Sequence, residues 1–168
     1  NKYEDTMTGY LASGNDVVLG GWDKSGSDSS SLTLNSENGG KYLSFIRKGS
    51  GNSAYLHQSI GNISGEIVIE QDIRFGMNAS FEYGADTSKG TTTAFNSTAF
   101  SFRLDNGKFK LNGTEIGSGE QNKWYHIVLS ADTTSKKCAA KVYDYSADGN
   151  YTSPIVQSSL ADFDSSFT

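Results

Sequence analysis

Hydrophobic and polar residues alternate in short runs along most of this chain, and turn residues separate the runs. In the segment EIVIEQDIRF, Ile67, Ile69 and Ile73 fall on one side of the chain, whereas Glu70 and Asp72 fall on the other. A period of two residues indicates a β-strand with one face in the core and one face in water. No segment of helical length keeps a period of 3.6 residues, so we expect no long helix.

The same pattern predicts eleven strands. They are expected near residues 16–20, 31–35, 41–48, 54–60, 65–75, 79–84, 99–105, 108–112, 124–131, 137–144 and 150–158. The sequence Asp-Asn-Gly at 105–107 is the clearest hairpin signal, because Asn-Gly tolerates the positive φ angles of a type I′ turn. Eleven short strands in one domain over residues 1–168 predict an all-β fold, a two-sheet antiparallel β-sandwich of the jelly-roll type.

Charge and composition narrow the class of partner. The chain has 168 residues and a net charge of −5, which argues against nucleic acid and anionic membrane surfaces as partners. No apolar run approaches the length of a membrane-spanning helix. The first residue is Asn1 rather than Met, so we expect a mature protein or a module cut from a longer one. We expect this module to be secreted and monomeric. The single cysteine, Cys138, is expected to be a buried thiol in a strand.

The segment WYHIVLSA raises the question of whether its histidine is catalytic. Alternation places Tyr125 and Ile127 on one face of a strand, and Trp124, His126 and Val128 on the other. The sequence shows no acid or nucleophile as a partner for His126, so a structural or surface role is favoured.

The region from FSFRLDNGKFKLNGTEIG to NKWYHIVLSADTTSKKCAAKVYD resembles concanavalin A-like and laminin-G-like jelly rolls. The opening YEDTMTG, followed by GGW, is similar to the start of many carbohydrate-binding modules of polysaccharide-degrading enzymes. The resemblance implies a jelly-roll fold. The family includes sugar-binding modules, glycoside hydrolases, lyases and protein-binding laminin-G domains, so the fold alone does not assign the function.

The resemblance also allows a test for an enzyme. Retaining glucanases of this fold carry Glu-x-Asp-x-(x)-Glu on one strand, and here Glu70 and Asp72 match the first two acids. Arg74 and Phe75 stand where the second Glu is required, so we expect no catalytic residues. Glu66 lies on the same face as Glu70 and offers an alternative pair. A lyase with a Tyr or Lys base beside an Arg is a further alternative.

Sugar binding needs flat aromatic faces and polar groups for hydroxyls. Candidate aromatic platforms are Trp22, Tyr42, Tyr55 and Tyr83. Arg74 and Arg103 lie on the polar faces of central strands, where a guanidinium can pair with a uronate carboxylate. We expect Arg74, Arg103 and Tyr83 to bind the glycan, with Trp22 at the rim of the site. Core packing of the aromatic rings and surface ion pairing of the arginines are the alternatives.

The resemblance implies a structural Ca²⁺ that ties the first strand to the last. Glu4 and Asp5 match the family's opening acidic pair, and Asp162 or Asp164 could supply the closing ligand. Exposed acidic termini are the alternative. The segment DYSADG at 144–149 imitates half of an EF-hand loop but lacks the closing Glu, and we interpret it as a turn.

Together these features predict a non-catalytic carbohydrate-binding module for a plant cell-wall polysaccharide, covalently linked to a hydrolase or lyase. The charge leaves both a neutral and a uronate-containing glycan open. The first alternative is a laminin-G-like module that binds a protein or glycoconjugate. The second alternative is a small glycanase or polysaccharide lyase of the same fold.

Overall fold

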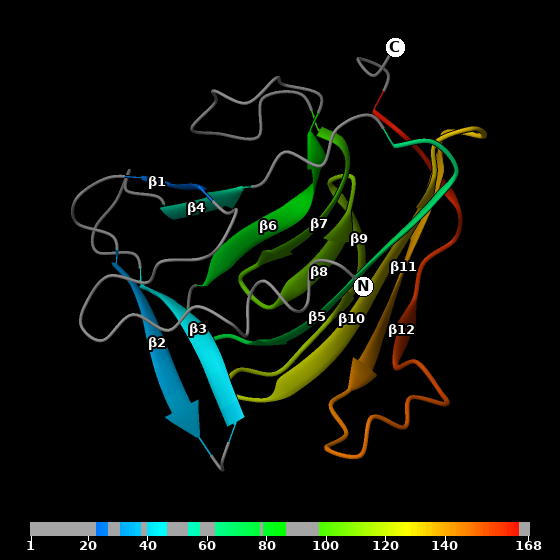
Figure 1. Cartoon of the computed structure of the whole chain (residues 1–168). Helices are drawn as coiled ribbons and strands as arrows, with labels where there is room; N and C mark the ends of the chain where they lie inside the picture. The colour runs from blue at the N-terminus through cyan, green and yellow to red at the C-terminus, as the bar shows by residue number, and fades with distance from the viewer. Residues whose placement is uncertain are drawn as a thin grey trace. The chain divides into compact units, whose positions relative to one another are not determined.

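The computed structural model in Figure 1 describes part of the chain in detail. The described residues are 23–26, 31–37, 40–46, 54–57, 63–77, 79–86 and 98–164. The chain packs into two compact units, residues 1–60 with 89–94 and residues 61–88 with 95–168. Regular structure in the described residues is all β-strand. None of them belongs to a helix long and apolar enough to cross a membrane.

The first unit contains two antiparallel strand pairs. β1 (Asp23–Gly26) pairs with β4 (Ala54–His57), and β2 (Ser31–Glu37) pairs with β3 (Gly40–Ile46). The strands predicted near 31–35, 41–48 and 54–60 are therefore confirmed with shifted ends. β1 was not predicted, because DKSG has no apolar alternation. The strand predicted near 16–20 lies outside the described residues.

The second unit contains two larger antiparallel sheets, which confirms the predicted two-sheet architecture. The five-stranded sheet has the order β12–β11–β10–β5, and β13 also pairs with β11. Its strands are β5 (Glu66–Arg74), β10 (Trp124–Asp132), β11 (Lys137–Asp144), β12 (Val156–Gln157) and β13 (Ala161–Asp162). The four-stranded sheet has the order β6–β7–β8–β9. Its strands are β6 (Ser80–Asp86), β7 (Thr98–Asp105), β8 (Lys108–Leu111) and β9 (Thr114–Ser118).

The apolar faces of these two sheets pack against each other as a β-sandwich. Phe109 of β8 meets Tyr125 of β10 edge-on, with ring centroids 5.4 Å apart, and both rings are buried. The alternation in each strand predicts these faces correctly: Phe102, Leu104 and Phe109 are fully buried, as expected. Cys138 is buried and free, as predicted. Burial of this apolar surface is the main stabilising term for the second unit.

Two Asn-Gly turns set the register of the four-stranded sheet. Asn106 and Gly107 have φ angles of 50° and 78°, which confirms the predicted type I′ hairpin between β7 and β8. Asn112 and Gly113, with φ angles of 46° and 81°, form a second turn that leads into β9. β9 was not predicted, because the segment NGTEIGSG was interpreted as a turn between strands. Gly117 is required there, since a Cβ would lie 2.6 Å from Cγ2 of Val156.

The C-terminal part of the second unit contains less strand than predicted. A strand was expected over 150–158, but only β12, Val156–Gln157, forms there, followed by β13. The segment 145–155 is instead a loop between β11 and β12. This loop borders the surface described next.

Candidate functional site

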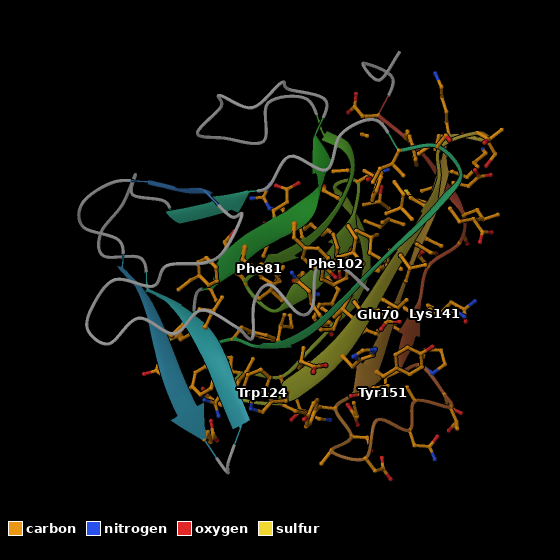
Figure 2. The ribbon with its side chains drawn as sticks, viewed as in Figure 1. Glu70, Phe81, Phe102, Trp124, Lys141 and Tyr151 are labelled. Carbon is orange, nitrogen blue, oxygen red and sulfur yellow. The ribbon has the colours of Figure 1, made fainter. Side chains whose placement is uncertain are left out.

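The outward face of the five-stranded sheet carries a group of aromatic side chains. Strand alternation turns Tyr125 and Ile127 of β10 into the core and leaves Trp124 and His126 on the outward side. On this side lie Trp124, His126, Tyr143, Tyr145 and Tyr151, which we call the aromatic face. Figure 2 shows Trp124 on β10 and Tyr151 from the loop after β11.

Strand register arranges the side chains of this face in rows. His126 stands opposite Asp72 of β5 on one side and Tyr143 of β11 on the other. In the next row, Val128 stands between Glu70 and Lys141. Cross-strand neighbours of this kind lie close enough for direct contact. The sheet therefore brings acidic, basic and aromatic groups from three strands onto one surface.

His126 has the partner that the sequence did not reveal. Its Nδ1 lies 2.8 Å from Oδ1 of Asp72, and the imidazole side chain is only 12% exposed. Tyr151 stacks on the imidazole, with ring centroids 3.8 Å apart and planes 4° apart. The stack and the hydrogen bond hold the ring of Tyr151, and with it this part of the loop, against the sheet. Burial raises the pKa of Tyr151, with a smaller contribution from the charge of Asp72.

A second aromatic pair lies at one end of the face. The rings of Trp124 and Tyr145 lie 6.2 Å apart, and the backbone N–H of Tyr145 donates to the carbonyl of Trp124 at 3.2 Å. Arg74 places its guanidinium carbon 5.0 Å from the centre of the Trp124 ring. Tyr145 is 45% exposed, so part of its ring is open to a ligand.

A shallow cavity of about 170 Å³ lies beside these rings. It is lined by Tyr143 and Asp144 at the end of β11 and by Asn150, Tyr151, Thr152, Ser153 and Ile155 of the loop. Lys123 pairs with the carboxylate of Asp144 at 2.8 Å. This hydrogen bond raises the pKa of Lys123, so the ammonium stays charged.

The outward face of the four-stranded sheet has a different chemistry. It carries Glu82, Arg103, Asp105, Lys108, Lys110 and Glu115, which we call the charged face. Nζ of Lys110 lies 2.9 Å from Asp105, and Nζ of Lys108 lies 2.9 Å from Glu115. The hydrogen bond from Lys110 is the main cause of the lowered pKa of Asp105. Five of these six groups form ion pairs with one another, as is usual on a solvated sheet face.

The structure separates the residues expected to form one sugar site. Arg74 lies on the aromatic face, whereas Arg103 lies on the charged face, 3.9 Å from Asp105. The two arginines belong to different sheets of the sandwich, which corrects the expectation that they share a groove.

Tyr83 is also corrected, because its place is inside the sandwich rather than on a polar face. Its side chain points to the core beside Phe102, with ring centroids 5.6 Å apart, and the residue is only 8% exposed. A buried ring offers no platform to a polysaccharide. Trp22 lies outside the described residues, and so does the side chain of Tyr55.

Two of the four expected calcium ligands, Asp162 and Asp164, lie within the described residues. Glu4 and Asp5 lie outside the described residues. Asp162 forms an ion pair with Lys137, and the backbone N–H of Asp164 donates to the carbonyl of Ala99. Among the described residues, no three His, Cys, Asp or Glu side chains gather as a metal site. The structural Ca²⁺ therefore stays a prediction. The segment 144–149 contains the turn that was expected, with the N–H of Gly149 donating to the carbonyl of Ser146 at 3.1 Å.

The sequence interpretation missed the tyrosines of the aromatic face. The signal was present in KVYDY, where Tyr143 and Tyr145 alternate with Val142 and therefore point away from the core. Tyr151 could not be found in this way, since it belongs to a loop and reaches His126 only through the folded chain.

Comparisons with known proteins give no relative: no family model, no curated protein and no solved structure matches this chain.

Proposed function

We propose that this chain is a non-catalytic carbohydrate-binding module of the jelly-roll type, and that a polysaccharide binds across the aromatic face. The observation that carries the proposal is the outward position of Tyr143, Tyr145 and Tyr151, beside a polar cavity and away from the core. Aromatic rings on a water-facing surface stack against the C–H side of sugar rings, and neighbouring polar groups bind the hydroxyls.

Polar groups around the rings match the hydroxyls of a glycan. Glu70 and Asp72 lie on the same outward side of β5, and Lys141 lies across the sheet on β11 (Figure 2). Asp72 and Lys141 are exposed. Carboxylates accept hydrogen bonds from hydroxyls and the ammonium donates them, so both roles are present. A module of this kind increases the local concentration of an attached enzyme on an insoluble substrate, even with modest affinity.

Affinity electrophoresis tests the proposal directly. The wild-type chain, Tyr145→Ala and Arg103→Ala are run through gels that contain soluble neutral or uronate polysaccharides, with and without EDTA. At least one glycan should retard the wild type and Arg103→Ala, whereas Tyr145→Ala should lose about tenfold in affinity because a partly exposed aromatic anchor is removed. Loss of retardation with EDTA would support the predicted Ca²⁺. If no glycan retards the wild type, the proposal fails and a protein-binding module becomes the leading alternative.

A polysaccharide lyase is the second candidate, and the contact of His126 with Asp72 and Tyr151 favours it. β-Elimination needs a base that removes the proton next to the uronate carboxylate and an acid that protonates the leaving glycosidic oxygen, and an imidazole beside a tyrosine provides two groups of this kind. Incubation with polyuronates, followed by ultraviolet absorbance of unsaturated products, tests this activity. Product formation that His126→Ala abolishes would replace the binding proposal with the enzymatic one.

A further inference from the structure

We infer that the cavity beside the aromatic face holds one uncharged sugar residue, a chain end or a side branch, and excludes a uronate. This inference rests on the proposed function and names the chemical class of its ligand. It follows from the size of the cavity, from the groups that line it and from the way its wall is held.

The size of the cavity limits how many sugar residues it can hold. Its volume is about 170 Å³. Sites for larger, drug-sized ligands usually measure about 300–1,000 Å³, so this cavity suits a single ring. Tyr143 at the end of β11 and Tyr151 in the loop contribute aromatic surface, with ring centroids 5.6 Å apart. A single ring fits best at the end of a chain or on a branch, whereas the main chain can continue toward Tyr145.

The polar lining suits hydroxyl groups. Asn150 supplies an amide, Thr152 and Ser153 supply hydroxyls, and Asp144 supplies a carboxylate. The side-chain hydroxyl of Tyr151 points elsewhere, since it donates to the carbonyl of Ser146 at 3.2 Å. The cavity therefore offers donors and acceptors on the loop side and an acceptor on the strand side, as a neutral sugar needs.

The charge of the lining opposes a uronate. Among the described residues that line the cavity, none is Lys or Arg. Lys123, close to its edge, is already paired with Asp144 at 2.8 Å. In the adjoining loop, Asp148 accepts hydrogen bonds from the hydroxyl of Ser146 and the N–H of Asn150, which lower its pKa and keep it ionised. A sugar carboxylate would meet the carboxylate of Asp144, and none of the described residues that line the cavity is a cation that could pair with it.

The loop wall is held before any ligand arrives. Tyr151 stacks on His126, and His126 is hydrogen-bonded to Asp72. These contacts connect the loop to β10 and β5, so the cavity does not have to be assembled on binding. A site held in this way loses less conformational entropy when it binds.

Chemical-shift mapping by NMR tests the inference with defined probes. The probes are methyl galactoside, glucoside, xyloside and arabinofuranoside, together with galacturonic and glucuronic acid, each titrated to millimolar concentration. Bacterially produced protein is used, because Asn150 stands in an Asn-Tyr-Thr glycosylation sequence. We expect at least one neutral sugar to shift the amide signals of residues 150–153, and both uronic acids to bind at least tenfold more weakly than that sugar.

A charge variant sharpens the test. Asp144→Asn removes the carboxylate and leaves Lys123 without its partner, so binding of the uronic acids should strengthen several-fold. Asp105→Asn, on the charged face, removes the same charge elsewhere and should change nothing at the cavity. Preserved dispersion of the NMR spectrum confirms that both variants fold.

The outcomes separate this inference from the proposed function. If wild-type protein binds uronic acids at residues 150–153 as well as neutral sugars, or if Asp144→Asn does not change the preference, the inference is overturned. If polysaccharides retard the protein in gels but no monosaccharide shifts these signals, the cavity inference fails and the aromatic face remains the binding surface. If neither occurs, both proposals fail.

Discussion

The two outward faces of the sandwich differ in the contacts that their polar and aromatic side chains make. On the charged face, Lys110 pairs with Asp105 and Lys108 pairs with Glu115. On the aromatic face, the imidazole of His126 and the ring of Tyr151 form a stack that lies outside the core. On the charged face most charged groups form ion pairs with one another. The aromatic face instead carries aromatic surface and hydrogen-bonding groups that can contact a ligand.

This difference shows why an arginine on a polar strand face is a weak sign of a binding site. Arg74 and Arg103 both follow the alternation of a central strand and were expected to act together. One lies over Trp124, and the other lies near Asp105 among ion-paired neighbours. The neighbours across the strands, rather than the residue type alone, decide the chemistry of the face.

The largest expected effect comes from removing two rings of the aromatic face. Tyr143→Ala combined with Tyr145→Ala should weaken polysaccharide binding about 100-fold, since each aromatic anchor contributes about tenfold. Isothermal titration with the glycan found by electrophoresis measures the loss. Lys108→Ala combined with Lys110→Ala is the matched control and should keep the affinity within about twofold. Equal loss in both double variants would remove the distinction between the two faces.

The next effect is smaller and concerns a positioning residue. His126→Ala removes the ring under Tyr151, so the affinity should fall about threefold to tenfold and amide hydrogen exchange in the 145–155 loop should accelerate. His126→Phe keeps a flat ring but loses the hydrogen bond to Asp72, and should restore part of the affinity. Loss of affinity with unchanged exchange in the loop would mean that the imidazole contacts the glycan itself.

The arrangement of the core could be predicted well from the sequence, because alternation depends on burial alone. Phe102, Leu104 and Phe109 alternate with charged residues, and they are buried as expected. The Asn-Gly turn at Asn106 was also predictable, since its positive φ angles are a local requirement. These features need no knowledge of distant parts of the chain.

The candidate site was harder to predict, because it depends on contacts between distant segments. His126 and Asp72 are 54 residues apart and meet through the pairing of β10 with β5. Tyr83 is the opposite case: alternation already places its ring on the same side of β6 as Phe81 and opposite Glu82, and this side faces the core. Its buried hydroxyl has no hydrogen-bond partner among the described residues, which sequence alone gives no reason to expect.

The charged face should contribute little to stability or binding. Lys110→Ala removes an exposed ion pair with Asp105, and surface pairs of this kind are weak. We expect the melting temperature to fall by no more than about 4 °C and glycan affinity to stay unchanged. Thermal unfolding of Lys110→Ala, Asp105→Ala and the double variant measures the coupling between the two groups. A much larger fall would show that this face has a structural role beyond surface pairing.

The smallest expected effect is a response of the melting temperature to acid. It involves one carboxylate on the charged face, Asp105, and one in the loop beside the aromatic face, Asp148. Hydrogen bonds from Lys110 lower the pKa of Asp105, and those from Ser146 and Asn150 lower the pKa of Asp148. Since each folded-state pKa lies below the unfolded value, the stabilisation is complete above about pH 4 and is lost as the pH falls through the folded-state pKa. Melting temperature should therefore fall on acidification below about pH 4, and slightly less steeply in Asp105→Asn and Asp148→Asn than in the wild type.

Only one of these two carboxylates, that of Asp148, should also influence the loop that lines the cavity. Asp148 holds the turn that precedes Asn150 and Tyr151, so its protonation loosens the loop that lines the cavity. Hydrogen exchange in the 145–155 loop, measured between pH 5 and pH 3 and corrected for the intrinsic rate, should show a rise in the wild type that Asp148→Asn makes shallower. Asp105→Asn should leave that rise unchanged, because its carboxylate belongs to the charged face. A rise altered equally by both variants would mean that acid loosens the whole sandwich, and that the loop has no separate acid response.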